Sequence, residues 1–349
     1  MVARLAASLP LLCAPPTLFG ADSSGRKHLG IGAYSFNLRW KAARDGQPKA
    51  RFKDPLEFLD YCHQLGAGGA QVALGARDAG YNGRLRARAE TLGMYLEGDL
   101  SLPKDESDAV RFESEIRAAS EAGAAVVRTA MLGGRRYETF DSAEAYRRFA
   151  ERSWQSLTLA EPILKKYRAR LAIENHKDRR VPELIALLKR ISSEYVGVCL
   201  DTGNNIALLE DPVEVVEALV PFAFSTHLKD MAVQPYEEGF LLSEVPLGDG
   251  FLDLKKMVAT LQKANPRIQF NLEMITRDPL KIPCLTTKYF ATMEDTSAVQ
   301  VAAALTQVRR NAPKKPLPHT SGLDPDQQLA LEESHVTASL SYAREHLGL

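Results

Sequence analysis

Between His28 and Asn311 the chain alternates short apolar segments with longer stretches of helical periodicity, and this alternation constrains the fold most. The apolar segments are rich in Val, Ile and Leu and lack a regular polar alternation, which is typical of strands buried on both faces of a parallel sheet. We expect eight such strands, over residues 29–36, 69–74, 94–99, 124–131, 170–175, 195–201, 222–228 and 268–274.

The intervals between these segments carry helix signals. In residues 141–167, apolar side chains recur at steps of three to five, and Asp141 and Ser142 stand at the expected N-cap. Asp54 and Asp211 are each followed by a proline, which is favoured at the first helical position. We therefore expect a helix at each of these places.

Eight strands that alternate with helices over about 250 residues predict an α/β fold of the (β/α)8 TIM barrel type. A doubly wound sheet is the rival fold, but it usually has a glycine-rich phosphate-binding turn after its first strand. Residues 32–37 read GAYSFN and contain no such turn, so we assign the barrel to residues 28–311. Residues 312–349 are expected to form a proline-rich linker and a C-terminal helix that packs outside the barrel or on a partner.

The first residues differ in composition from the rest. Arg4 precedes an apolar stretch, and the small residues Gly20 and Ala21 follow it, which is the outline of a secretory signal peptide. We expect residues 1–25 to be a leader and the mature protein to be exported to the periplasm. The alternative is an Ala- and Leu-rich terminus of a cytoplasmic protein.

Charge and cysteine content exclude several classes of function. The 44 Lys and Arg residues balance 44 Asp and Glu residues, whereas a nucleic-acid-binding protein needs a basic surplus. No apolar run is long enough for a membrane-spanning helix. The cysteines show no paired spacing that would indicate a zinc ribbon or a disulfide framework; they are Cys13, Cys62, Cys199 and Cys284.

Charged residues stand at the ends of the last four predicted strands. In a barrel the carboxyl ends of all strands open into one mouth, so we expect these side chains to converge there. They are Glu174, Asp201, His227 and Glu273. Carboxylates with one imidazole suit Mn²⁺, Mg²⁺ or Co²⁺, and Zn²⁺ usually takes more His or Cys ligands. The alternative for each residue is a cap on the next helix.

The strand ends IENH, LDTGN, STHLKD and LEM resemble the xylose-isomerase-like barrel superfamily over about residues 28–310. This superfamily contains sugar and sugar phosphate isomerases and epimerases, inosose and dehydroshikimate dehydratases, and endonuclease IV. The resemblance implies that the four residues hold one Mn²⁺ and that Glu174 and Glu273 are also the catalytic acid and base. One position departs from the pattern. The epimerases usually carry a His three residues after the strand-six Asp, where this chain has Asn204.

Further residues near the strand ends are candidate substrate ligands. For each of them a structural role is the alternative, as support for the metal ligands, a surface ion pair or packing. These candidates are His176, Asn204, Lys229, Asp230, Arg128 and Tyr34, and Lys177 next to His176 belongs to the same group.

The expected function is a metal-dependent isomerase or epimerase of a sugar or keto-sugar. Its metal stabilises an enediolate, while Glu174 and Glu273 exchange the proton. A lyase or dehydratase of a keto-sugar or inosose would use the same residues and is the alternative. A non-catalytic sugar-binding barrel fits less well because all four candidate ligands are present. An endonuclease IV-like hydrolase fits less well because few His residues stand at strand ends and the net charge is zero. The expected partner is a small-molecule sugar, and the sequence leaves a homo-oligomer open.

Overall fold

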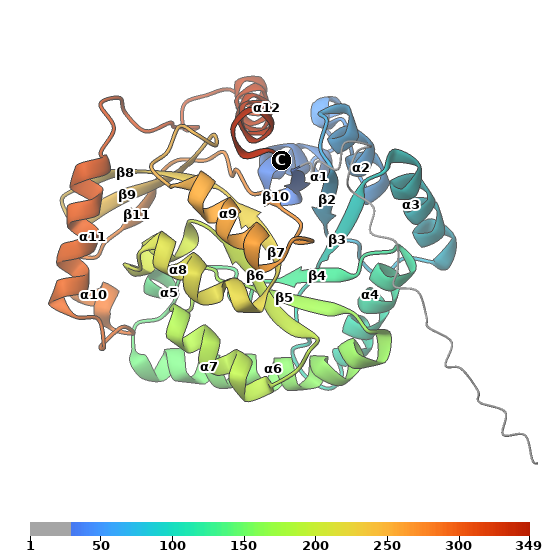
Figure 1. Cartoon of the computed structure of the whole chain (residues 1–349), viewed down its shortest axis with the longest axis horizontal. Coiled ribbons are helices and arrows are strands. Elements are labelled where there is room, and N and C mark those ends of the chain that lie inside the picture. The colour runs from blue at the N-terminus through green and yellow to red at the C-terminus, as the bar shows by residue number, and fades with distance from the viewer. Residues whose placement is uncertain (1–28) are drawn as a thin grey trace, which may run out of the picture.

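The computed structural model describes residues 29–349, so the expected leader over residues 1–25 lies outside the described residues. Eight parallel strands close into a barrel in the order β1-β10-β7-β6-β5-β4-β3-β2 (Figure 1). Each of the eight expected segments contains one barrel strand. The strands are β1 (Gly30–Gly32), β2 (Gly69–Val72), β3 (Tyr95–Asp99), β4 (Val126–Thr129), β5 (Arg170–Glu174), β6 (Val196–Asp201), β7 (Ala223–Leu228) and β10 (Asn271–Leu272).

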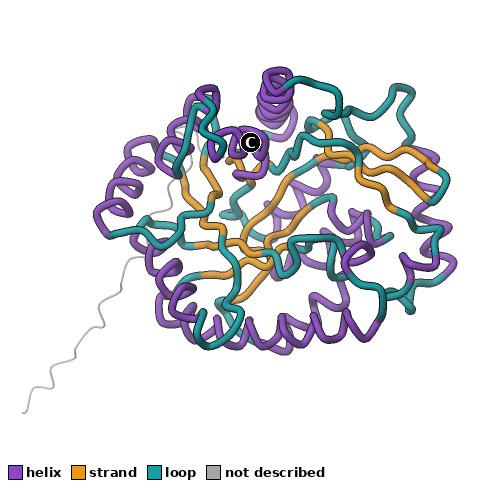
Figure 2. The backbone as a smooth tube through the Cα atoms, turned by 180° about the vertical axis from the view of Figure 1, so that it is seen from behind, coloured by secondary structure: helices purple, strands orange, loops and turns teal. Residues whose placement is uncertain are grey.

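Helices surround the strands as an outer layer, which Figure 2 shows from behind. The helices that follow barrel strands are α2 (Pro55–Gln64), α3 (Ala79–Leu92), α4 (Ala109–Glu121), α5 (Arg136–Thr139), α6 (Ala143–Tyr167), α7 (Val181–Ile191), α8 (Pro212–Leu219) and α9 (Leu254–Ala264). The first and last parts of the described chain add α1 (Asn37–Arg44), α10 (Thr287–Phe290), α11 (Ala298–Asn311) and α12 (Pro325–Tyr342). The short helices are η1 (Ala33–Phe36), η2 (Pro48–Ala50), η3 (Asn204–Leu208), η4 (Val220–Phe222) and the π-helical turn η5 (Ala343–Leu347). None of the helices in residues 29–349 is both long and apolar enough to cross a membrane.

The expected helix starts are present. The Asp54 carboxylate accepts a hydrogen bond from the N–H of the third residue of α2, and Asp211 caps α8 in the same way. Ser142 caps α6, whereas the neighbouring Asp141 forms an ion pair of 3.1 Å with Lys288. The local signals therefore placed these helix boundaries to within two residues.

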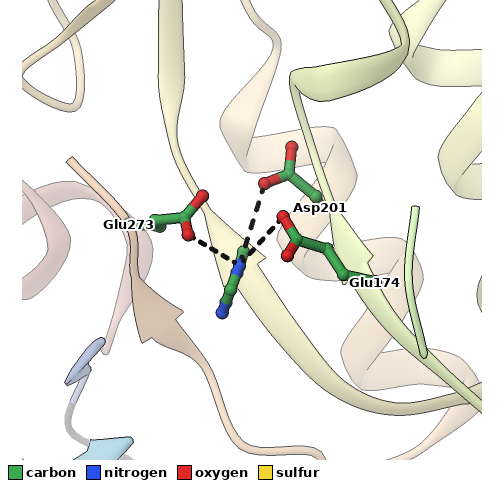
Figure 3. A group of neighbouring side chains, drawn as sticks. Glu174, Asp201 and Glu273 are labelled. Carbon is green, nitrogen blue, oxygen red and sulfur yellow. Dashed lines mark ion pairs between the residues drawn. The ribbon is translucent and has the colours of Figure 1, made fainter. Parts of the chain in front are cut away.

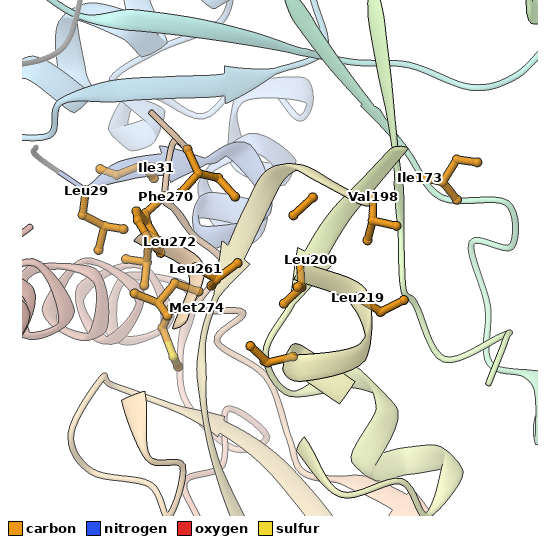
Figure 4. Packing of buried hydrophobic residues seen from close by; sticks show 14 of the residues in the cluster. Leu29, Ile31, Ile173, Val198, Leu200, Leu219, Leu261, Phe270, Leu272 and Met274 are labelled. Atoms are coloured by element: carbon orange, nitrogen blue, oxygen red, sulfur yellow. The ribbon is translucent and has the colours of Figure 1, made fainter. Parts of the chain in front are cut away.

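Side-chain alternation along the strands separates the core from the barrel interior. Ile173, Val198, Leu200 and Leu272 belong to one large cluster of buried apolar side chains, in which Leu219 of α8 also takes part (Figure 4). Successive side chains of a strand point to opposite faces, so the residues between these apolar positions face the inside of the barrel. The polar strand-end residues occupy those inward positions.

The first strand is shorter than expected. The sequence pattern predicts a strand over residues 29–36, but β1 ends at Gly32 and the chain continues as η1. Phe36 is fully buried against Phe52, Phe58 and Tyr61, so it has a packing role. The prediction of a strand up to residue 36 is therefore wrong, because the chain after Gly32 turns to pack Phe36 into an aromatic cluster. This cluster contains residues of α2 and of the turn before it.

A small antiparallel sheet was not predicted. Its strands are β8 (Asp230–Tyr236), β9 (Gly239–Val245) and β11 (Leu280–Ile282), in the order β11-β9-β8. Figure 1 shows it at the side of the barrel, where α11 packs against β8. Its strands β8 and β9 follow the carboxyl end of β7 in the chain.

The C-terminal helix packs against the first helices of the barrel. The Glu332 carboxylate of α12 accepts hydrogen bonds from the backbone N–H groups of Leu38, at 2.7 Å, and Arg39, at 3.1 Å. Arg39 also forms an ion pair of 2.9 Å with Glu333. These contacts fasten the C-terminal extension to α1, directly after η1.

Candidate metal centre

Four side chains from adjacent strands meet at the carboxyl end of the barrel. They are Glu174 of β5, Asp201 of β6, His227 of β7 and Glu273, directly after β10. All four are buried, and one ligand atom from each lies within 4.8 Å of the others. Figure 3 shows the carboxylates of Glu174, Asp201 and Glu273 pointing toward one another. We call these four residues the metal cluster.

The His227 ring lies between the carboxylates. Its Nδ1 is 3.2 Å from Glu273 Oε1, 3.4 Å from Glu174 Oε1 and 3.9 Å from Asp201 Oδ2. This Nδ1 has no hydrogen-bond partner among the residues that the structure describes. Although burial opposes protonation, Cys199, Glu273 and Glu174 raise the pKa of His227 well above its usual value. A cation bound by the carboxylates would compete with a proton for this nitrogen.

A chain of hydrogen bonds determines which nitrogen of His227 faces the carboxylates. Gln71 Nε2 donates to Glu97 Oε2 at 2.9 Å, and the same oxygen accepts from Ser225 at 2.6 Å and Asn271 at 2.9 Å. With its NH₂ committed to a carboxylate, Gln71 presents Oε1 to His227 Nε2, at 2.6 Å. Nε2 is therefore the donor nitrogen, which leaves Nδ1 for a cation.

These residues fit a divalent cation. Three carboxylates buried at one point are costly without compensation, and a cation removes that cost. Three carboxylates and one imidazole suit Mn²⁺, Mg²⁺, Co²⁺ or Zn²⁺. The unpartnered Nδ1, directed at the carboxylates, supplies a fourth ligand atom of the right type.

The family comparison agrees with the barrel fold. A family model described as xylose isomerase-like TIM barrel matches residues 59–285. The chain belongs to this family.

Among individual proteins, the chain is similar to 3-oxo-isoapionate decarboxylase of Pectobacterium atrosepticum, with 29% identity over 244 residues that cover 67% of this chain and 81% of the relative. Solved structures share its fold. A xylose isomerase-like TIM barrel protein of Mycobacterium smegmatis in complex with magnesium has a TM-score of 0.53 at 15% identity, covering 80% of this chain and 97% of that one. D-psicose 3-epimerase of Clostridium cellulolyticum has a TM-score of 0.55 at 12% identity, covering 81% and 99%.

Two buried cations flank the metal cluster of this xylose isomerase-like barrel. Arg128 forms ion pairs with Glu174 Oε2 and, at 3.0 Å, with Asp99. Lys229 Nζ lies 2.9 Å from Asp201 Oδ2 and 2.5 Å from Glu273 Oε2. Although burial opposes this, the Arg128 charge holds the pKa of Glu174 below its usual value. Arg128 and Lys229 thus contact the ligands themselves.

Asn204 connects the metal cluster with two lysines. Its Nδ2 donates to Glu174 Oε1 at 2.8 Å, and its Oδ1 accepts from Lys177 and, at 3.3 Å, from Lys229. Burial and the neighbouring charge of Lys229 lower the pKa of Lys177 to about 8. Asn204 stands where the sequence pattern of the epimerases would have a His. Its amide oxygen instead accepts hydrogen bonds from two lysine ammonium groups.

The remaining substrate candidates differ in placement. Tyr34 is 42% exposed in η1, and its ring faces Arg128 with the guanidinium carbon 5.3 Å from the ring centroid. His176 is half-buried, and burial lowers its pKa to about 3. The Asp230 carboxylate accepts hydrogen bonds from four backbone N–H groups, those of Met231, Gly248, Gly250 and Leu252. Asp230 therefore holds the loop after β9, and its oxygens are occupied.

Gln71 and Glu97 are functional residues that the sequence analysis missed. Both lie in segments that were predicted as buried strands, and both are 2% exposed. Their polar side chains at inward-facing strand positions could have indicated a role near the site, because an apolar residue would satisfy the packing there. His227, the partner of Gln71, is 156 residues away in the chain, and Ser225, a partner of Glu97, is 128 residues away, so no local pattern reveals these pairings.

Replacing Gln71 with Leu should weaken Mn²⁺ binding about 10–100-fold, because such outer hydrogen bonds orient the ligand and set its tautomer. Isothermal titration of the metal-free protein measures this. Ser225→Ala is the matched control, because it removes another donor to the same Glu97 oxygen and leaves the Gln71–His227 contact intact. The control should bind Mn²⁺ nearly as the wild type does. An equal loss in both variants would show that the hydrogen-bond chain has no specific effect on His227.

Proposed function

We propose that this protein is a divalent-metal-dependent lyase that removes carboxylate as CO₂ from a small 3-oxo sugar acid by way of an enediolate. Mn²⁺ is the proposed ion, held by Glu174, Asp201, His227 and Glu273. The ion would act as a Lewis acid for the negative charge that develops on the substrate oxygens. Relatives of this chain are enzymes, among them a decarboxylase and an epimerase.

The observation that carries this proposal is the ion pairing of the ligand carboxylates. Arg128 pairs with Glu174, and Lys229 pairs with Glu273 and Asp201. Although burial opposes it, the charges of His227 and Lys229 hold the pKa of Glu273 well below its usual value. Carboxylates with low pKa values are poor acceptors of a carbon-bound proton. A reaction that reaches an enediolate without removing such a proton fits this site best.

Decarboxylation of a 3-oxo acid is such a reaction. The bond between the carboxylate carbon and C2 breaks, and its electron pair moves toward the C3 carbonyl as neutral CO₂ leaves. Carbon C2 then takes up a proton that comes from water. Although burial opposes it, Asp201 and Glu273 raise the pKa of Lys229, so this ammonium keeps its charge throughout. A fixed buried cation beside the metal cluster is suited to stabilise the developing oxyanion.

An isomerase or epimerase of a keto-sugar is the second candidate, and one observation favours it. Glu174 and Glu273 lie three strands apart in the barrel, and each directs its Oε1 toward His227 from a different side. Two carboxylates in this arrangement can flank a bound sugar. One would remove the proton next to the carbonyl, and the other would return a proton on the opposite face.

Incubation of Mn²⁺-loaded protein with 3-oxo sugar acids and with neutral keto-sugars in D₂O separates these functions. The lyase releases one CO₂ for each product molecule and leaves one deuterium at the carbon that lost the carboxylate. The epimerase introduces deuterium next to a carbonyl and releases no CO₂. Heat-treated protein controls for spontaneous decarboxylation. Turnover of neutral keto-sugars without CO₂ release from any acid would reject the lyase in favour of the second candidate.

A further inference from the structure

Lys177 is a buried cation without a carboxylate partner among residues 29–349. It lies in the loop between β5 and α7, three residues after Glu174, and is 2% exposed. The hydrogen bond that the structure gives its ammonium goes to a neutral acceptor, Asn204 Oδ1. Burial of an ammonium without a counter-ion is costly, so such a group is expected to have an anionic partner in the working protein.

The other buried cations around the metal cluster differ from Lys177 in this respect. Arg128 pairs with Asp99 and Glu174, and Lys229 pairs with Asp201 and Glu273. A third cation, Arg277, has its counter-ion in Glu244, with Nε and Oε2 3.1 Å apart. Glu244, the nearby carboxylate that attracts Lys177, is thus already paired with Arg277. Lys177 is therefore the cation of this group that has no ion pair of its own among residues 29–349.

The position of Lys177 relative to the metal cluster is well defined. Lys177 and Lys229 donate to the same Asn204 oxygen, and the Asn204 amide donates to Glu174. The backbone carbonyl of Lys177 accepts a hydrogen bond of 2.8 Å from the Arg136 N–H, which anchors the loop. One amide side chain thus connects the ammonium with a metal ligand, a separation that a small sugar acid can bridge.

We propose that Lys177 binds the carboxylate of the substrate. This assignment rests on the proposed function and adds the subsite that selects a sugar acid over a neutral sugar. One positive charge without an ion pair of its own matches a monoanion. A phosphate dianion usually requires several donors, and around Lys177 the neighbouring cations Lys229 and Arg277 are already paired.

Binding of compounds that lack a carbonyl tests the subsite apart from catalysis. Ribonate, ribitol and ribitol 5-phosphate share a five-carbon polyol and cannot form an enediolate. Isothermal titration of the Mn²⁺-loaded protein should show a preference for ribonate over ribitol. Lys177→Met should lower the affinity for ribonate about 10–100-fold, as expected for the loss of a hydrogen bond between charged groups, and leave ribitol binding unchanged.

Two further variants separate the charge of Lys177 from its hydrogen bond and from general charge effects. Lys189→Met removes one exposed positive charge from α7 and should bind all three compounds as the wild type does. Lys177→Gln keeps a donor for Asn204 without the charge and should lose the preference as Lys177→Met does. Manganese content and thermal melting verify that each variant is folded and loaded.

Three outcomes would overturn the assignment. One is an unchanged preference for ribonate in Lys177→Met. Another is an equal loss of ribitol binding, which would show a merely structural role. The third is tighter binding of ribitol 5-phosphate that depends on Lys177, which would identify a phosphate subsite. If the Lys177-dependent preference holds but no acid loses CO₂, the subsite stands and the proposed reaction fails.

Discussion

His227→Ala and Asp201→Ala should each lose more than about 100-fold in affinity for Mn²⁺ while the barrel remains folded. Each substitution removes one of four ligands, and loss of a direct ligand exceeds the ~10–100-fold effect of an outer hydrogen bond. Without His227 the cluster lacks its nitrogen ligand. Without Asp201, Lys229 remains beside Glu273 and repels the cation.

Metal content after dialysis, measured by elemental analysis, checks this prediction, and circular dichroism verifies the fold. His176→Ala is the matched control, because this histidine lies two residues after Glu174 and does not belong to the metal cluster. The control should retain about one ion per chain. Equal metal content in the wild type and in both ligand variants would contradict the assignment of the site.

Lys229→Met should reduce turnover of the substrate about 10²–10³-fold while the protein keeps its Mn²⁺. The magnitude is that of removing one charge-stabilising donor from an active site. The metal is retained because Lys229 competes with the cation for Asp201 and Glu273. This variant should therefore lose turnover without losing metal, whereas the ligand variants should lose both.

Glu174→Gln and Glu273→Gln complete this comparison. If the second candidate function holds, each should lose ~10²–10⁴-fold in turnover, because the amide cannot exchange a proton. The variant that lacks the abstracting base should also stop deuterium exchange from D₂O. Near wild-type turnover in Lys229→Met, together with lost exchange in a metal-loaded Glu variant, would replace the lyase with the two-carboxylate mechanism.

The sequence by itself determined the barrel, because the patterns that mark its strands and helix starts are local in the chain. Short apolar segments mark strands buried on both faces, and an Asp or Ser before a helix start satisfies backbone N–H groups within three residues. Strand-end positions then place Glu174, Asp201, His227 and Glu273 at one mouth, because the carboxyl ends of parallel strands share one side of the barrel. The structure brings these four together as that argument requires.

Only the tertiary structure decided what each neighbouring polar residue does. Gln71 contacts His227 from another strand, and Lys177 binds Asn204 and has no carboxylate partner within the described part of the chain. Asp230 directly follows the Lys229 that joins the metal cluster, yet its carboxylate is bound by backbone N–H groups 18 to 22 residues further on. The physical reason is that closing the barrel fixes which distant groups meet. The partner of a buried charge depends on that packing and not on its neighbours in the chain.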